Sequence, residues 1–566
     1  MAGLVEVEGC DIHQKGIMVN SPLGWAARNG QEEKVKMLLA QDDIDPNMRD
    51  QEGRTPLWWA AFNGHQGVVE MLLGRGGTDP NRSDRYGRTP LWVAVSDGHE
   101  GVVKMLLGRD DTDPNQRCGE GETVLQWAVR NRDQRMMKVL LRRDDIDPNQ
   151  PDDYGETPLG IAASIGDEGV TKVLLGRDDT NPNRPDRYGR TPLWVAVSDG
   201  HEGVVKMLLE RDDTDPNRRC GEGETVLQWA VRNGDQRMVK VLLGRDDMDP
   251  NRPDDYGETP LGIAVSIGDE GVMKVLLERD DTDPNQPSSK GRTPLWWAAH
   301  NGLQGMVKML LGRDDTNPDK PDRDGVTPLG IAASIGHEGV MKILLRRDDV
   351  NPNKLDKDNK TPLWWAAFSG HERVVKALLE RGGVNTCTPD DYYGPLSAAA
   401  YNGHEGVVKL LLQQDGANPG GPGGASKTPL YRAAQNGHKE IVQILLGHNF
   451  SPDSPDEFGR TPLSMAAENG HEEVVKLLLV RDDVNPDKPD KDGQRPLWWA
   501  ARNGHEEVVR LLLEQKEVSP NKPNRYGQTP LSIAARYDHG QVIALLQPPT
   551  NTVYSIVQED ISVYFI

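Results

Sequence analysis

The chain has 566 residues, of which 36% are hydrophobic, and its 66 Lys and Arg residues against 88 Asp and Glu residues give a formal net charge of −22 at pH 7. A chain this acidic repels phosphate backbones, and its basic residues are interleaved with Asp, so we expect no nucleic-acid binding. Four cysteines exclude a disulfide-stapled secreted scaffold, and we find no apolar run long enough to cross a membrane. These features predict a cytoplasmic protein, with the nucleus as the alternative.

The first segment, residues 1–20, is mixed in polarity and lacks the pattern of a signal peptide. From Pro22 onward the tripeptide Thr-Pro-Leu, or a near variant of it, recurs in sixteen copies as far as Pro530. The step between copies is 34 residues, and 33 residues in two places. Separate globular domains would not keep such a step, so the periodicity predicts a repeat protein.

One unit, residues 84–115, shows why each copy folds as two short helices and a turn. Thr89 suits a helix N-cap and Pro90 suits the first helical position, where its missing N–H costs nothing. Gly98 is placed to end this helix in a left-handed conformation. A second apolar helix is expected from about Glu100, and the Asp-, Asn- and Pro-rich residues 109–115 predict a turn.

A single helix pair of this kind cannot bury its own apolar faces, but stacked pairs can. The core is then a thin strip between neighbouring repeats, which accounts for the low apolar share. We therefore predict an all-α solenoid of about sixteen repeats over residues 21–547, with residues 1–20 as a degenerate N-terminal cap. Residues 548–566 match no repeat and form a C-terminal tail that could add a strand or cover the last helix pair.

The sequence also has a second, longer period of 102 residues, which equals three repeats. Residues 84–185 are nearly copied by residues 186–287, and the divergent Thr-Val-Leu unit appears in both copies, at Thr123 and Thr225. This pattern indicates a tandem duplication of three repeats. The simplest interpretation is growth of the array without a new function.

These units resemble the ankyrin repeat. The residues that carry the resemblance in one unit are Asp84, Gly87, Thr89, Pro90, Leu91, Ala94, Gly98 and His99, and the match recurs in most units. The His that the family carries after Pro-Leu is absent from every unit, and the family's Gly-Ala-Asp segment is mostly Arg-Asp-Asp. Those departures resemble the large ankyrin arrays of filamentous fungi. The resemblance implies stacked helix-turn-helix units with β-hairpin-like fingers.

The sequence indicates no enzyme, no cofactor and no metal site. It contains neither a phosphate-binding loop nor a dinucleotide-binding fingerprint. Ten of the thirteen histidines occupy one repeat position, so they are spaced by one repeat, roughly 10 Å, whereas zinc ligands lie about 2 Å from one centre. We interpret these histidines as side chains that pack at the start of the second helix.

All thirteen tryptophans follow the Leu of the repeated tripeptide by one or two residues. The first of these places is where the family has its His, so an indole N–H there can replace the imidazole hydrogen bond. Packing between repeats is the interpretation we favour, because Trp buries a large area and its N–H needs one partner. The alternative is an aromatic strip of binding anchors along the inner groove.

The resemblance implies that partners bind at the finger tips and on the inner, concave face of the first helices. Aromatic residues at these places are not required by the turn, and Tyr is favoured at protein interfaces. The candidate tip residues are Tyr86, Tyr154, Tyr188, Tyr256, Tyr393, Phe458 and Tyr526, and the candidate helix residues are Phe62, His300, Phe368 and Tyr401. The tips also alternate in charge, with the candidate binding residues Arg88 and Arg190 in basic bands and Glu156 and Glu258 in acidic ones. For the charges alone, ordinary solvation is the interpretation we favour.

The function predicted from these features is non-catalytic: a monomeric scaffold or adaptor that binds partner proteins, with membranes and nucleic acids excluded. The alternative is a sensor arm of a fungal innate-immunity receptor with an NTPase domain of the NACHT type. In that case the NTPase would lie outside these residues, because no phosphate-binding loop is present.

Overall fold

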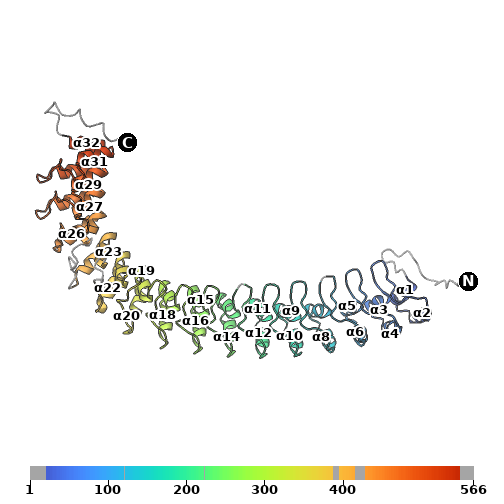
Figure 1. Cartoon of the computed structure of the whole chain (residues 1–566). Helices are drawn as coiled ribbons and strands as arrows, with labels where there is room; N and C mark the ends of the chain where they lie inside the picture. The colour runs from blue at the N-terminus through green and yellow to red at the C-terminus, as the bar shows by residue number, and fades with distance from the viewer. Residues whose placement is uncertain (1–20, 120, 222, 387–393, 415–427, 548–566) are drawn as a thin grey trace. The chain divides into compact units, whose positions relative to one another are not determined.

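The computed structural model describes residues 21–119, 121–221, 223–386, 394–414 and 428–547 (Figure 1). The chain divides into two compact units, Met1–Asp283 and Pro284–Ile566. The predicted N-terminal cap (residues 1–20) and the C-terminal tail (residues 548–566) lie outside the described residues.

Within the described residues both units consist of paired short helices joined by loops. Unit 1, Met1–Asp283, contains α1 (Pro22–Arg28), α2 (Glu32–Leu39), α3 (Pro56–Phe62), α4 (Gln66–Gly74), α5 (Pro90–Ser96), α6 (Glu100–Leu107), α7 (Val124–Arg130), α8 (Gln134–Leu140), α9 (Pro158–Ile165), α10 (Glu168–Leu175), α11 (Pro192–Ser198), α12 (Glu202–Leu209), α13 (Val226–Arg232), α14 (Gln236–Leu242), α15 (Pro260–Ile267) and α16 (Glu270–Leu277).

Unit 2, Pro284–Ile566, continues the same pattern. It contains α17 (Pro294–His300), α18 (Gln304–Leu311), α19 (Pro328–Ile335), α20 (Glu338–Leu345), α21 (Pro362–Ser369), α22 (Glu372–Arg381), α23 (Pro395–Asn402), α24 (Glu405–Leu412), α25 (Pro429–Gln435), α26 (Lys439–Gly447), α27 (Pro462–Asn469), α28 (Glu472–Leu479), α29 (Pro496–Asn503), α30 (Glu506–Leu513), α31 (Pro530–Arg536) and α32 (Gly540–Leu546). No helix in the described part of the chain has the length and apolar character needed to cross a membrane.

The first helix of each pair begins where its local sequence predicts. The Thr89 side chain accepts a hydrogen bond from the backbone N–H of Trp92 at 3.1 Å, and Pro90 occupies the first helical position of α5. Gly98 follows the end of α5 with φ of +74°, a conformation that favours glycine. In the divergent unit, where Val replaces Pro, Thr123 and Gln126 form a reciprocal capping box instead.

The core of each unit is the strip between successive helix pairs. Within each unit, the first helices pack on the second helix of their own pair and on the first helices of neighbouring pairs, as α3 does with α4 and α5. Leu91, Ala94, Val102 and Leu106 are at most 1% exposed. These are the apolar positions that the sequence assigns to the buried face, so the predicted stacking is confirmed.

The loops between pairs form hairpin-like fingers, and no strand is assigned anywhere in the described ranges. Within one finger, Asp84 N–H donates to the Arg88 carbonyl and Gly87 N–H donates to the Asp84 carbonyl, both at 3.0 Å. Arg85 N–H donates to the Glu52 carbonyl of the preceding finger at 2.9 Å. The fingers are therefore tied to one another by their backbones as well as by the helices below them.

Candidate protein-binding surface

The finger tips present a row of exposed aromatic side chains. An aspartate at the base of the finger sets the tip in most of these units: Asp84 Oδ1 accepts from the backbone N–H groups of Tyr86 and Arg88, both at 2.9 Å. This turn leaves the ring in solvent. The predicted tip residues that the structure describes are 50–76% exposed: Tyr86, Tyr154, Tyr188, Tyr256, Phe458 and Tyr526. The seventh, Tyr393, lies outside the described residues.

Arginine side chains hold several of these rings in place. The Arg187 guanidinium lies 4.9 Å from the ring centre of Tyr154 and 4.8 Å from that of Tyr188, so it joins the aromatic tips of two consecutive fingers. Arg85 lies 4.7 Å from the ring of Tyr86 in the same way. Cation–π contacts of this kind fix the ring orientation before any partner arrives. The sequence alone did not predict that Arg187 contacts two rings. The feature that could have indicated it is the dipeptide Arg187-Tyr188, which lies one repeat after Tyr154.

The two basic tip residues singled out from the sequence are engaged inside their own fingers. Arg88 Nε donates to Asp84 Oδ2 at 2.9 Å, and Arg190 Nε donates to Asp186 Oδ2 at 2.7 Å. Both arginines are half-buried, and Arg190 also lies 5.0 Å from the ring centre of Tyr188. Their charge is largely neutralised, so they position the finger and its ring.

Acidic tip residues pair with arginines of the preceding repeat that are not among the predicted basic bands. Arg117 lies 3.4 Å from Asp153, and in the duplicated segment Arg219 lies 2.8 Å from Asp255. These ion pairs are largely solvent-exposed, so each contributes little to stability. These ion pairs place opposite charges side by side at the tips of the fingers concerned.

The candidate residues on the first helices stack on tryptophans of the same helix. Phe62 lies 5.2 Å from the ring centre of Trp58, His300 lies 5.2 Å from Trp296, and Phe368 lies 4.9 Å from Trp364, each pair nearly parallel. The spacing of four residues brings the rings onto one face of the helix. The fourth candidate, Tyr401, is half-buried with Arg432 5.5 Å from its ring centre.

The tryptophans themselves are buried or half-buried, which favours packing over a row of exposed anchors. At the second place, the indole N–H groups of Trp59, Trp365 and Trp499 donate to the finger aspartates Asp50, Asp356 and Asp490. At the first place, Trp58 donates to the Arg88 carbonyl of the next finger at 3.0 Å. Among the described residues, the N–H groups of Trp92, Trp194, Trp296 and Trp498 have no such partner, so the predicted substitution for the imidazole bond holds at Trp58.

The ten histidines at one repeat position form a series of bonds between repeats. Each Nε2 lies 2.9–3.1 Å from a carbonyl at the end of the first helix of the preceding repeat. A carbonyl only accepts, so Nε2 carries the proton. The predicted place at the start of the second helix is confirmed, and burial lowers the pKa of His471. The described ranges contain no group of three or more His, Cys, Asp or Glu that could hold a metal.

The turn after each second helix, which we call the turn edge, joins repeats through Asn and Arg. Asn149 Nδ2 donates to the Asp179 carbonyl at 2.7 Å, and its Oδ1 accepts from Asn181 N–H at 2.6 Å. Arg177 donates to the Arg143 carbonyl at 2.9 Å and to Asp179 Oδ1 at 2.8 Å. The sequence predicted only a turn in this segment; the recurrence of Asn and Arg once per repeat is the signal for these bonds.

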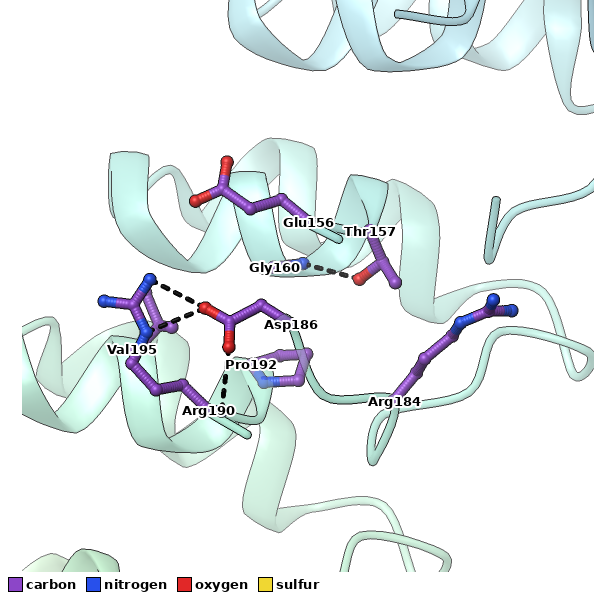
Figure 2. A pocket seen from close by; sticks show the side chains of 8 residues that line it. All are labelled: Glu156, Thr157, Gly160, Arg184, Asp186, Arg190, Pro192 and Val195. Atoms are coloured by element: carbon purple, nitrogen blue, oxygen red, sulfur yellow. Dashed lines mark hydrogen bonds and ion pairs between the residues drawn. The ribbon is translucent and has the colours of Figure 1, made fainter. Parts of the chain in front are cut away.

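A hollow opens at the base of the fingers where Gly160 stands at the place of the tryptophans (Figure 2). Its volume is about 230 Å³, including the space open to solvent. The lining residues are Glu156, Thr157, Gly160, Arg184, Asp186, Arg190, Pro192 and Val195. Figure 2 shows Arg184 on one side of the hollow, and Glu156 with the Asp186–Arg190 pair on the other.

The chain matches the family model of ankyrin repeats along almost its whole length. The matched segments overlap and cover residues 3–84, 23–118, 76–152, 125–220, 213–288, 268–355, 295–390, 348–422, 396–490 and 480–554. No curated protein matches the chain.

Among solved structures, the chain is similar to ankyrin repeat domains. Each of the two described here covers about two fifths of the chain. The human ASB11 ankyrin repeat domain is 28% identical, covers 39% of this chain and 99% of its own, with a TM-score of 0.34. The ankyrin repeat domain of Bcl-3, a member of the IkappaB protein family, is 24% identical, covers 40% of this chain and 99% of its own, with a TM-score of 0.37.

Proposed function

Because the chain belongs to the ankyrin repeat family, we propose that it is a non-catalytic scaffold or adaptor that binds partner proteins through its finger tips and the inner face of its first helices. Ankyrin repeats are generally protein-interaction modules. The contact residues we assign are the tip aromatics Tyr86, Tyr154, Tyr188, Tyr256, Tyr393, Phe458 and Tyr526, and the helix residues Phe62, His300, Phe368 and Tyr401.

The observation that carries this proposal is the repeated exposure of large aromatic side chains at one place of the finger. The described tip rings are at least half exposed, although nothing in the turn requires a ring there. Tyr supplies a large amphipathic contact area at a low cost in side-chain entropy. Rings already held by Arg85 and Arg187 lose still less freedom when a partner binds.

Partner selection follows from the charges around the rings. A partner segment with alternating acidic and basic residues complements the opposite charges that Arg117–Asp153 and Arg219–Asp255 place at the tips. The net charge of −22 disfavours nucleic acid as that partner. We further propose that the protein acts as a monomer in the cytoplasm, with the nucleus as the alternative.

The test is affinity capture from a lysate of the source cells with the full chain and with a variant in which Tyr86, Tyr154, Tyr188 and Tyr256 are changed to Ala. We expect the variant to lose most of the captured proteins, because truncated interface aromatics often cost more than 2 kcal/mol each.

A matched control changes exposed apolar residues away from the fingers. Met37 in α2 and Val480 after α28 are 67% and 85% exposed, so Met37→Ala and Val480→Ala should leave capture unchanged. Equal capture by the chain, the tip variant and this control contradicts the assignment of the tips as the contact surface.

A further inference from the structure

We propose that the hollow at Gly160 is a socket for a glutamine side chain of a partner segment that lies across the fingers before α9 and α11. This inference rests on the proposed protein-binding function and names the chemistry that one part of the surface recognises.

The equivalent place in the preceding repeat is filled by a glutamine of the chain itself. Gln126 in α7 sends its Nε2 to the carbonyls of Gln150 and Glu156, both at 3.0 Å, and so ties its own repeat to the next finger. In the duplicated segment Gln228 does the same with the Arg252 and Glu258 carbonyls. In both copies of the duplicated segment, a carboxamide from this helix position therefore bridges its repeat to the next finger.

One repeat after Gln126, Gly160 provides no side chain to make that bridge. The carbonyls in register with those of Gln150 and Glu156 belong to Arg184 and Arg190. The Arg190 carbonyl accepts from Asp186 N–H at 3.0 Å, and a carbonyl has two lone pairs. In the preceding finger, the Glu156 carbonyl uses both, one for Asp152 N–H and one for Gln126.

The backbone does not require glycine at this position. A Cβ added to Gly160 would meet only Thr157 Oγ1, at an ordinary contact distance of 3.4 Å. Gly160 lies inside α9, where glycine destabilises a helix relative to alanine. The chain therefore keeps an open space at a place where a side chain would fit.

The charges around the hollow favour a neutral hydrogen-bond donor. Asp186 Oδ1 accepts from the N–H groups of Tyr188 and Arg190, and its Oδ2 accepts from Arg190 Nε, so this ion pair is internally satisfied. An incoming carboxylate would face Glu156 and backbone carbonyls, and an incoming cation would face the guanidinium group of Arg184. A carboxamide avoids both conflicts and can donate two hydrogen bonds.

Exposed rings on the same two fingers provide the flanking contacts. Tyr154 and Tyr188 are 57% and 55% exposed, and Arg187 lies over both of them. A segment that places one glutamine in the socket can lay its neighbouring residues on these rings. The socket then sets the register of the segment, and the rings add contact area.

The first experiment replaces Gly160 by a residue whose side chain can occupy the socket. We compare hydrogen exchange of residues 184–190 in the full-length variants Gly160→Gln and Gly160→Met, which have side chains of similar length but differ in hydrogen-bonding capacity. We expect exchange to be about fivefold slower in Gly160→Gln, because its amide can donate to the finger carbonyls. Equal exchange in the two variants overturns the proposal.

The second experiment uses a library of random twelve-residue peptides displayed on phage and selected on the full chain. We expect enriched peptides to share a glutamine, and changing that glutamine to Glu, or blocking the socket with Gly160→Gln, to weaken binding about tenfold. The matched control is Gly330→Gln, which lies in the same local sequence but in a repeat whose successor carries Trp365 at the place of Val195; it should leave binding unchanged.

The outcomes separate this inference from the proposed function. Peptides that lose binding in Tyr154→Ala and Tyr188→Ala but not in Gly160→Gln overturn the socket and support the finger surface. A selection that yields no peptide also counts against the socket, whereas the scaffold function is decided by the capture of whole proteins.

Discussion

The turn edge of unit 1 and that of unit 2 make the same connection with different side chains. In unit 1 an asparagine donates to a carbonyl thirty residues ahead in seven consecutive repeats: Asn47, Asn81, Asn115, Asn149, Asn183, Asn217 and Asn251. In unit 2 the residue at this place varies: Asn285 and Asn353 keep the amide, whereas Asp319, Asp453 and Asp487 carry a carboxyl group.

The Asp side chains form only one of the two hydrogen bonds that an Asn bridge makes. Asp319 Oδ2 accepts from Asn351 N–H at 2.7 Å, but its buried Oδ1 has no hydrogen-bond partner among the described residues. Asp453 repeats this arrangement with Asn485. Burial raises the pKa of both carboxyl groups. Replacing the amide N–H donor by a carboxyl oxygen therefore converts a neutral bridge between repeats into a buried acid. The free energy that this acid costs the folded chain depends on pH.

The largest effect is expected from removing a complete bridge in unit 1. Asn149→Ala loses the bonds to the Asp179 carbonyl and to Asn181 N–H, so local stability should fall by about 2 kcal/mol. Because long arrays do not unfold in one step, the measurement is hydrogen exchange of residues 179–181. Asn131→Ala, which removes a bond within a single repeat, is the control and should leave that segment unchanged.

A smaller effect of opposite sign is expected in unit 2. Asp319→Asn restores the missing donor opposite the Asp349 carbonyl and removes a buried charge, so we expect a gain of about 1 kcal/mol at pH 7. Exchange of residues 349–351 measures it. Asp348→Asn, at an exposed neighbouring position, controls for the change in net charge; an equal gain there would mean that the bridge is not the cause.

The gain from Asp319→Asn should also depend on pH. The pKa of Asp319 in the folded chain lies above its ordinary value, so protonation of this carboxyl group favours folding. The stability that the protonated group contributes at low pH is lost as the pH rises through the folded pKa. The variant should therefore match the native chain at low pH and exceed it above that range. A gain that stays constant with pH would show that the carboxyl group does not titrate in this way.

The smallest effect is expected at the ion pairs of the turn edge. Arg177 lowers the pKa of Asp179 through its hydrogen bonds, so this carboxylate contributes stability above its unfolded pKa and loses it as the pH falls through the folded one. Asp179 is about half exposed, and Asp179→Asn should cost only a few tenths of a kcal/mol. Hydrogen exchange of residues 177–181 at low and high salt checks this, and a cost above about 1 kcal/mol would contradict the comparison with the buried bridges.

The sequence predicted the candidate surface less completely than the fold. Exposed rings at the tips follow from the finger pattern, and the six described tip aromatics are exposed. The contact of Arg187 with two rings and the hollow beside Gly160 were not predicted, because each joins side chains from two repeats. The sequence placed Arg88 in a basic band at the tips. In the structure its guanidinium is instead bonded to Asp84 within the same finger.

The sequence by itself determined the helix pairs, since the signals that start and end them act within a few residues. Thr89 caps the helix that Pro90 begins, and Gly98 ends it in a conformation that other residues disfavour. Only the tertiary structure decided which polar groups join the repeats, because His99 meets a carbonyl 37 residues away and Asn149 one 30 residues away. Those distances close only after neighbouring pairs have packed, and a buried polar group then takes the partner that packing places beside it.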